Sequence, residues 1–493
     1  MKTRLFSFVL FAVLAFVASA SAQIGRRFPS EKKIVPDPVT GVPLTFLTST
    51  PAGDSKIYQT HHQWTSDGKW LIFRSNRVPG GQAMAVNEET GDIVQVTESG
   101  FQGMLCISDI SMTLYFLRTQ RLPGAEPETP PPPAPGDATA VPSGRGGRGG
   151  RGGPRGPTQI IAVDLAKLFA DSAAGTLKAS TEYEHIKATI PPEMGPPGDM
   201  ALDPAEEFAY VRVGSAEAAK HLPADVKPEP AFGPRGMGAG PTGLINVNLK
   251  TGESKFIVAV PFQIGHVQTN PWNPGEIVFC WETGGKAPTR MWTIMADGTG
   301  LRPVYPESPF DWITHETVIT KDEVAFAMLY LRPPLGGRGR GAGGGAPKAP
   351  PAPIPPEQAA ILDQTGMDGH PTGVGIVNLR THEMRIVGQV PLGDPGRSIW
   401  HVNGSPDGRW AVADDFQYRL WLIDRHSGEM NLLADMGHKT TAADHIHPTF
   451  NANSTKIEIQ SAMLSENGRS LNIVVVPIPK AWLARTYSEK VPQ

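Results

Sequence analysis

The sequence predicts an all-β protein, a seven-bladed β-propeller that carries two disordered low-complexity insertions. Three observations support this fold class. Short runs rich in Val, Ile, Phe and Trp recur, turns of the Asp-Gly and Thr-Gly-Glu types separate them, and the pattern returns every roughly 40 to 50 residues. One such sheet cannot bury both of its faces alone, so the blades must supply one another with neighbours in a closed ring.

The first repeat shows the pattern clearly. Trp64 leads into the turn Asp67-Gly68, and the apolar strand 70–73 follows it. The seven copies occupy residues 64–92, 105–116, 201–253, 270–280, 318–326, 405–424 and 448–459. We expect the strand 44–47 to close the ring against the last blade. A β-sandwich with further domains explains this even spacing less well.

The remaining segments divide the chain into a signal peptide (1–22), a lead-in (23–36), a single propeller (37–483) and a tail (484–493). The insertions, about residues 122–157 and 333–357, combine proline runs with Arg-Gly-Gly or Gly-Arg repeats. They have too few apolar side chains to fold, which predicts disordered loops. Arg-Gly-Gly tracts can bind RNA, but a solvated insertion is the simpler interpretation, and weak contact with acidic polysaccharide is a third.

The N-terminus predicts a secreted or periplasmic protein. Lys2 and Arg4 precede an apolar run at 5–17, and Ala20-Ser21-Ala22 forms a small-residue cleavage site. The apolar run is too short for a membrane span, so no stable membrane insertion is expected. Removal of the signal takes the formal net charge from −3 to −5, because it deletes two positive charges. This near-neutral balance argues against a nucleic-acid partner.

The chain has two cysteines and 13 histidines, and these numbers limit the kinds of metal site that it can form. Cys106 and Cys280 lie in apolar runs, so we expect buried thiols rather than a disulfide, and they cannot form a cysteine-rich site. Five histidines precede the turn glycine of their repeat, or its equivalent, by seven to nine residues: His61, His266, His315, His401 and His447. This position starts the innermost strand, which lines the channel of a propeller.

A single histidine in a strand is usually structural, but a structural repeat residue would be expected in all seven blades. Five in register therefore favour a polar site on the propeller axis. His62 and His445 lie beside members of this set, and His445 and His447 share one face if they lie on a strand. Neutral imidazoles suit a borderline divalent metal such as zinc, manganese or iron, and the spacing does not choose among them.

Several of these segments resemble the oligogalacturonate lyases, seven-bladed propellers that act on pectin fragments. The matching stretches are residues 37–48, 61–73, 264–282, 290–298 and 314–316, followed by His445-Ile446-His447-Pro448. The order Gly-His, Thr-His-Glu, His-x-His-Pro is the specific part of the match. With the insertions left out, the resemblance covers the propeller nearly end to end.

The resemblance implies β-elimination on an acidic oligosaccharide such as oligogalacturonate. It implies a divalent metal, Mn²⁺ in the family, held by His315, His445 and His447, with His266 as the Brønsted base. We place His61, His62 and His401 at the substrate. A metal would stabilise the charge that develops on the uronate carboxylate, and a positioned base contributes about 10²–10⁴-fold.

Two positions depart from the family pattern. Ala442 stands where the family has a glutamine metal ligand, and Asp444, His401, Gln63 or water are alternative ligands. Gly243 stands near the family's substrate arginine, for which Arg212 is a conceivable replacement. A non-catalytic, TolB-like binding platform is the alternative function. A propeller-type serine peptidase is excluded, because the chain has no Gly-x-Ser-x-Gly motif. The sequence does not indicate an oligomeric state.

Overall fold

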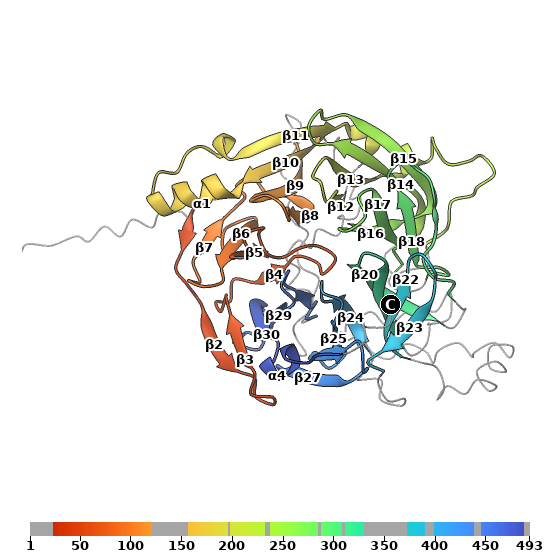
Figure 1. Ribbon diagram of the computed structural model, residues 1–493. Coiled ribbons are helices and arrows are strands. Elements are labelled where there is room, and N and C mark those ends of the chain that lie inside the picture. Colours follow the sequence, from red (N-terminus) through yellow and green to blue (C-terminus); the bar gives the residue numbers. More distant parts are fainter. Residues whose placement is uncertain are drawn as a thin grey trace, which may run out of the picture.

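Seven antiparallel sheets surround a central axis and follow one another around the ring in sequence order (Figure 1), which confirms the predicted propeller. The structure is a computed structural model. It describes residues 23–120, 156–195, 198–231, 237–283, 287–307, 311–329, 372–389, 399–437 and 445–487. The predicted signal peptide and nearly all of both predicted insertions lie outside the described residues.

The strands of each blade are given from the axis outwards. Blade 1 has β4 (Asp54–Lys56), β5 (Trp70–Ser75), β6 (Gln82–Asn87), β7 (Ile93–Gln95) and β1 (Arg27–Phe28). Blade 2 has β8 (Gln102–Ile107), β9 (Thr113–Thr119), β10 (Thr158–Asp164) and β11 (Glu184–Ile190). Blade 3 has β12 (Met200–Leu202), β13 (Phe208–Val213), β14 (Ala239–Asn248) and β15 (Ser254–Phe262). Blade 4 has β16 (Ile264–Thr269), β17 (Glu276–Trp281), β18 (Met291–Met295) and β19 (Arg302–Pro303).

The second half of the ring repeats this plan. Blade 5 has β20 (Trp312–Thr320), β21 (Glu323–Leu329), β22 (Gly373–Asn378) and β23 (Met384–Val387). Blade 6 has β24 (Ile399–Gly404), β25 (Trp410–Asp415), β26 (Arg419–Asp424) and β27 (Met430–Asp435). Blade 7 has β28 (Thr449–Phe450), β29 (Lys456–Ser461), β30 (Asn472–Pro477), β3 (Pro43–Phe46) and β2 (Lys33–Pro36). The short helices are α1 (Leu165–Ala174), α2 (Ser215–Ala218), α4 (Lys480–Leu483), η1 (Ser180–Glu182) and η2 (Pro192–Met194).

An N-terminal strand closes the ring, as predicted. β3 pairs with β30 in blade 7, with Thr45 opposite Val475 and Phe46 opposite Val474. The prediction of a separate lead-in at residues 23–36 is wrong, because β1 pairs with β7 and β2 pairs with β3. β1 is two residues long and β2 is largely exposed, so neither shows the apolar alternation by which a strand is recognised in a sequence.

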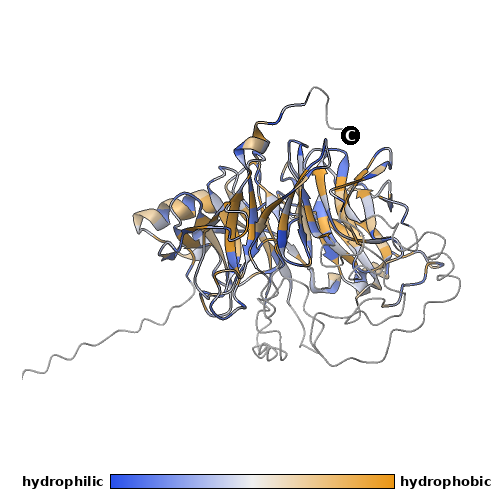
Figure 2. Cartoon of the chain, turned by 90° about the horizontal axis from the view of Figure 1, so that it is seen from below, coloured by the Kyte–Doolittle hydropathy of each residue, from blue (hydrophilic) through white to orange (hydrophobic). Residues whose placement is uncertain are grey.

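The hydrophobic core lies between neighbouring blades. Ile72 and Ala85 of blade 1, for example, pack with Leu114 and Phe116 of blade 2. Side chains on both faces of the middle strands are buried, as in β17 and β25. Figure 2 shows the hydrophobic residues along the strands. Each blade thus depends on both neighbours for burial of its faces. This packing holds the loops and strand ends that face the channel in place.

Helix α1 lies at the outer edge of the ring (Figure 1). Asp164 caps its N-terminus by accepting a hydrogen bond from the Lys167 amide at 2.9 Å, and Phe169 stacks on Trp70 of blade 1 at 4.2 Å between ring centroids. None of the helices in the described residues has the length and apolar character that a membrane crossing requires. Cys106 and Cys280 are buried free thiols, as expected.

Candidate functional site

Four histidines from blades 5, 6 and 7 gather beside the channel. We call His315, His401, His445 and His447 the histidine cluster. The ring of His401 is its centre, with its centroid 4.1 Å from that of His315, 3.8 Å from that of His447 and 5.4 Å from that of His445. The ring of Tyr58, from the loop after β4, lies 5.2 Å from that of His447. The predicted metal ligands therefore lie in one neighbourhood, together with a residue predicted to bind substrate.

The backbone turns several of these side chains out of the regular alternation of a strand. His266, His315 and His447 have positive φ angles of 50°, 57° and 51°. The pairing register shifts at His266 in β16 and at His315 in β20, and a similar shift occurs at His401 in β24. A bulge re-aims a side chain, and a non-glycine residue in this conformation costs of order 1–3 kcal/mol. Such repeated strain at corresponding positions marks a functional site.

Three rings of the cluster are held through Nδ1. The Tyr58 hydroxyl is hydrogen-bonded to His315 Nδ1 at 2.6 Å. His401 Nδ1 donates to Asp414 Oδ2 at 2.9 Å, and His447 Nδ1 donates to Gln59 Oε1 at 3.1 Å. Metal-binding histidines commonly have one ring nitrogen held by such a partner, so that the other can bind the ion. In the chemistry of its donors, the histidine cluster therefore fits a divalent metal.

Burial disfavours the charged forms of His315 and Asp414. Burial lowers the pKa of His315 well below its usual value, and His401 and Arg290 act in the same direction. Burial raises the pKa of Asp414 to about 7, although backbone amides that donate to its carboxylate oppose the shift. His315 is therefore uncharged at neutral pH, and an uncharged imidazole is the form that binds a metal.

His266 lies beside the cluster, within a network of charged groups from blades 4 and 5. Its Nδ1 is 3.0 Å from Glu316 Oε1, and its Nε2 is 3.2 Å from Glu282 Oε2. Arg290 Nε donates to Glu316 Oε2 at 2.7 Å. Burial alone would raise the pKa of Glu316, but Arg290 and His266 hold it at about 2. The ionised Glu316 thus fixes the His266 ring through Nδ1, while Nε2 faces Glu282.

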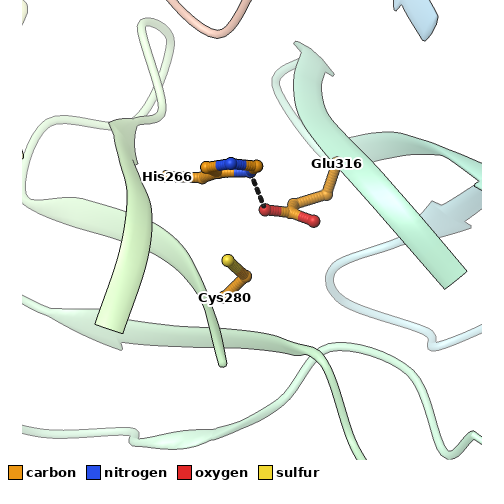
Figure 3. Close-up of side chains that lie close together, drawn as sticks. All are labelled: His266, Cys280 and Glu316. Atoms are coloured by element: carbon orange, nitrogen blue, oxygen red, sulfur yellow. Dashed lines mark hydrogen bonds and ion pairs between the residues drawn. The ribbon is translucent and has the colours of Figure 1, made fainter. Parts of the chain in front are cut away.

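A second group of possible metal donors includes this histidine. His266, Cys280 and Glu316 lie close together (Figure 3), with ligand atoms within 4.8 Å of one another. Burial raises the pKa of the Cys280 thiol well above its usual value, so this thiol stays protonated. Arg290 already supplies a positive charge to Glu316. Both facts make the donors of this group less suited to a cation than imidazoles, although it is the group whose ligand atoms converge within 4.8 Å in the described part of the chain.

The other predicted substrate residues lie in a separate cavity. The prediction that His61 starts an inner strand is wrong. His61 lies in a loop after β4, because β4 lies earlier in the chain than the repeat pattern indicated. Its Nε2 is hydrogen-bonded to the Met200 carbonyl at 2.9 Å. The His62 side chain is 50% exposed and pairs with Asp109 at 2.8 Å. The cavity lies between the ends of the inner strands β8, β12 and β16.

The His445–His447 segment also differs from the prediction. It precedes β28 rather than lying on a strand, and the two rings are 6.1 Å apart and nearly perpendicular. Ala442 and Asp444 lie outside the described residues. Sequence reasoning assigned no role to six site residues: Tyr58, Gln59, Glu282, Arg290, Glu316 and Asp414. Arg290, Glu282 and Glu316 lie within the stretches that carry the family resemblance, which was the available signal.

Comparisons with known proteins support the same relationship. No family model matches the chain. An oligogalacturonate lyase solved in complex with manganese aligns with 93% of this chain and 99% of its own, with a TM-score of 0.62 and 18% identity. The oligogalacturonate lyase of Vibrio parahaemolyticus aligns with 93% of this chain and 100% of its own, with a TM-score of 0.62 and 17% identity. The chain has the fold of the oligogalacturonate lyases.

Sequence similarity to these lyases is local. The chain is 31% identical over 90 residues to the oligogalacturonate lyase of Dickeya dadantii (strain 3937), and to the same extent to the oligogalacturonide lyase of Pectobacterium atrosepticum. This stretch is 18% of the chain and 23% of each relative, so the match spans about a quarter of the curated relatives' length. The resemblance to oligogalacturonate lyases that the motifs predicted is confirmed.

Proposed function

We propose that this protein is a metal-assisted lyase that cleaves an acidic, uronate-containing oligosaccharide by β-elimination. The observation that carries the proposal is the pairing of His266 with the ionised Glu316 beside the histidine cluster. A positioned base and a site for a divalent cation are the two components that this reaction needs. The likeness to oligogalacturonate lyases in fold, and locally in sequence, supports the same reaction class.

His315, His445 and His447 would hold the cation, for which Mn²⁺ is the family's precedent. When bound, the cation supplies positive charge that stabilises the carboxylate of a uronate as negative charge develops on it. Tyr58 and Gln59 orient the rings of His315 and His447. Orientation of this kind lowers the cost of assembling the site when a ligand enters.

His266 Nε2 takes the proton from the carbon next to the uronate carboxylate. The electron pair of that C–H bond forms the new C=C bond, and the glycosidic oxygen leaves with the electrons of the broken C–O bond. Glu316 retains the His266 ring in one orientation by accepting from Nδ1. Glu282, at 3.2 Å from Nε2, accepts a hydrogen bond from the imidazolium that results.

A non-catalytic binding platform is the second candidate, and one observation favours it. Gly243, near the position of the family's substrate arginine, lies in β14 where an added Cβ would be 2.8 Å from the Val258 carbonyl oxygen. This position therefore cannot carry an arginine without a backbone shift. Arg212, the conceivable replacement, is engaged with Asp199 at 3.5 Å.

Incubation of the purified protein with oligogalacturonates and other uronate oligomers separates the two candidates. The lyase predicts an unsaturated, ultraviolet-absorbing product with added Mn²⁺ and its loss with a chelator. Absence of product from every uronate tested, with binding of the same oligomers retained, would establish the binding platform instead. We also propose export through the signal at residues 1–22, and N-terminal sequencing of the mature protein tests this.

A further inference from the structure

The central member of the histidine cluster is not one of the three histidines that the family resemblance assigns to the metal. His401 is 1% exposed. Its ring centroid lies 4.1 Å from that of His315 and 3.8 Å from that of His447, so its ring lies between theirs. An oligosaccharide must reach a residue that it contacts directly. A buried ring enclosed by other imidazoles is poorly placed for that contact and well placed for a shared ion.

Asp414 connects His401 with the neighbouring ligand segment. This carboxylate is 1% exposed and accepts the His401 amide at 2.5 Å and His401 Nδ1 at 2.9 Å. It also accepts the amide of Ile446, between His445 and His447, at 3.1 Å. One buried side chain of β25 thus positions ligand candidates from two blades. A carboxylate on the outer nitrogen of an imidazole fixes the tautomer that binds through Nε2.

We propose that His401 is a metal ligand, so that this chain holds its ion by four imidazoles, from His315, His401, His445 and His447. The inference rests on the metal of the proposed function. His401 takes the place of the glutamine ligand whose position in the sequence is Ala442. Asp414 is a positioning residue, and Gln59 supports the cluster from outside by accepting from His447 Nδ1.

The change of donor alters which metal the site prefers. Amide oxygen is a donor that suits Mn²⁺, whereas imidazole nitrogen suits Zn²⁺, Ni²⁺ and iron. A site built from imidazoles alone therefore discriminates more strongly against Mn²⁺ than a site with a glutamine oxygen. The protein prefers a later first-row metal such as Zn²⁺ over Mn²⁺ by a wider margin than its own His401→Gln variant does.

Titration of metal-free protein with Zn²⁺ and with Mn²⁺ alone tests the proposal without any substrate. For His401→Gln we expect the affinity for Zn²⁺ to fall about 10–100-fold. The ratio of the Zn²⁺ affinity to the Mn²⁺ affinity should fall about tenfold. Asp414→Asn should weaken Zn²⁺ binding by about 10–100-fold. His221→Gln is the matched control, because His221 lies outside the site and pairs with Glu217, and it should bind both metals as the unaltered protein does.

The visible spectrum of the Co²⁺-loaded protein gives an independent measurement. Its ligand-field bands should shift in His401→Gln and stay unchanged in His221→Gln. Zn²⁺ affinity and Co²⁺ bands unaltered in folded His401→Gln and Asp414→Asn would overturn the assignment, as would an unaltered protein that binds neither ion. If the variants lose the metal but no uronate is cleaved by any loaded form, the proposed lyase fails and the ligand assignment stands.

Discussion

Replacement of Glu316 by glutamine tests the charged network that holds the candidate base. The carboxylate is completely buried and contacts both His266 and Arg290, and the Arg290 side chain is only 2% exposed. The substitution keeps the shape of the side chain but leaves the Arg290 guanidinium buried without its strongest partner. Glu282 is a longer contact at 3.9 Å and does not compensate.

Two arguments give the size of the expected loss of stability, one from the pKa of Glu316 and one from buried ion pairs in general. The pKa of Glu316 is about 2, against 4.5 for an unperturbed glutamate. A difference of about 2.5 pKa units corresponds to about 3 kcal/mol of stability at pH 7. Loss of one partner from a buried ion pair typically costs about 3–5 kcal/mol. We therefore expect Glu316→Gln to lower the free energy of unfolding at pH 7 by about 3 kcal/mol.

The effect should depend on pH in a stated direction. Because folding depresses the pKa of Glu316, its contribution is complete above the unfolded value of 4.5 and is lost as the pH falls through 2. At pH 3 the difference between the variant and the unaltered protein should shrink to roughly half of its value at pH 7. Urea unfolding curves at both pH values measure these differences.

A matched control separates burial from charge. Glu429→Gln removes a surface carboxylate that contacts Arg485 and is 54% exposed, so it should change stability by less than about 1 kcal/mol. The reasoning about the network is refuted if Glu316→Gln costs no more than Glu429→Gln at pH 7. It is equally refuted if the cost stays constant from pH 7 to pH 3.

Three further predictions concern the proposed reaction. His266→Asn should lower turnover of a cleaved uronate by about 10²–10⁴-fold while elemental analysis finds the metal content unchanged; loss of the metal would instead make His266 a ligand. His447→Ala should remove the metal, because the variant lacks a proposed ligand, the imidazole that Gln59 orients. Stoichiometric metal in this variant would contradict the ligand role of His447. Phe416→Ala should raise KM several-fold with little change in kcat, because this 38% exposed ring packs at a tilt against Trp400, whose ring contacts His315, and could support a sugar there; an unchanged KM would show that Phe416 does not contact the substrate.

The architecture could be predicted from the sequence because it repeats. Each Asp-Gly or Thr-Gly turn is a local signal, and the even spacing converts seven weak signals into one strong pattern. The closing strand at residues 44–47 was found in the same way. β1 and β2 were missed because two to four largely exposed residues carry no measurable periodicity, and only the finished sheets give them partners.

The histidines could be found from their spacing, but their supporting residues could not. Tyr58, Gln59 and Asp414 come from a loop of blade 1 and a strand of blade 6, and nothing in their local sequence marks them as partners of distant imidazoles. Strand alternation also failed at His315, whose positive φ angle redirects the side chain, and at His447, which precedes β28 instead of lying on a strand. These positions are set by tertiary contacts, which local patterns do not encode.

The closure of the ring has a consequence for metal binding, because the first and last blades share the site. Tyr58 and Gln59 belong to the first blade, whereas His447 belongs to the last, and they are in contact in the ring that the pairing of β3 with β30 closes. The complete set of contacts around the histidine cluster therefore exists only when the ring of blades is closed. If the protein binds a metal as proposed, uptake with full affinity requires the closed ring, and the bound ion would stabilise that ring relative to chains in which the first and last blades are apart.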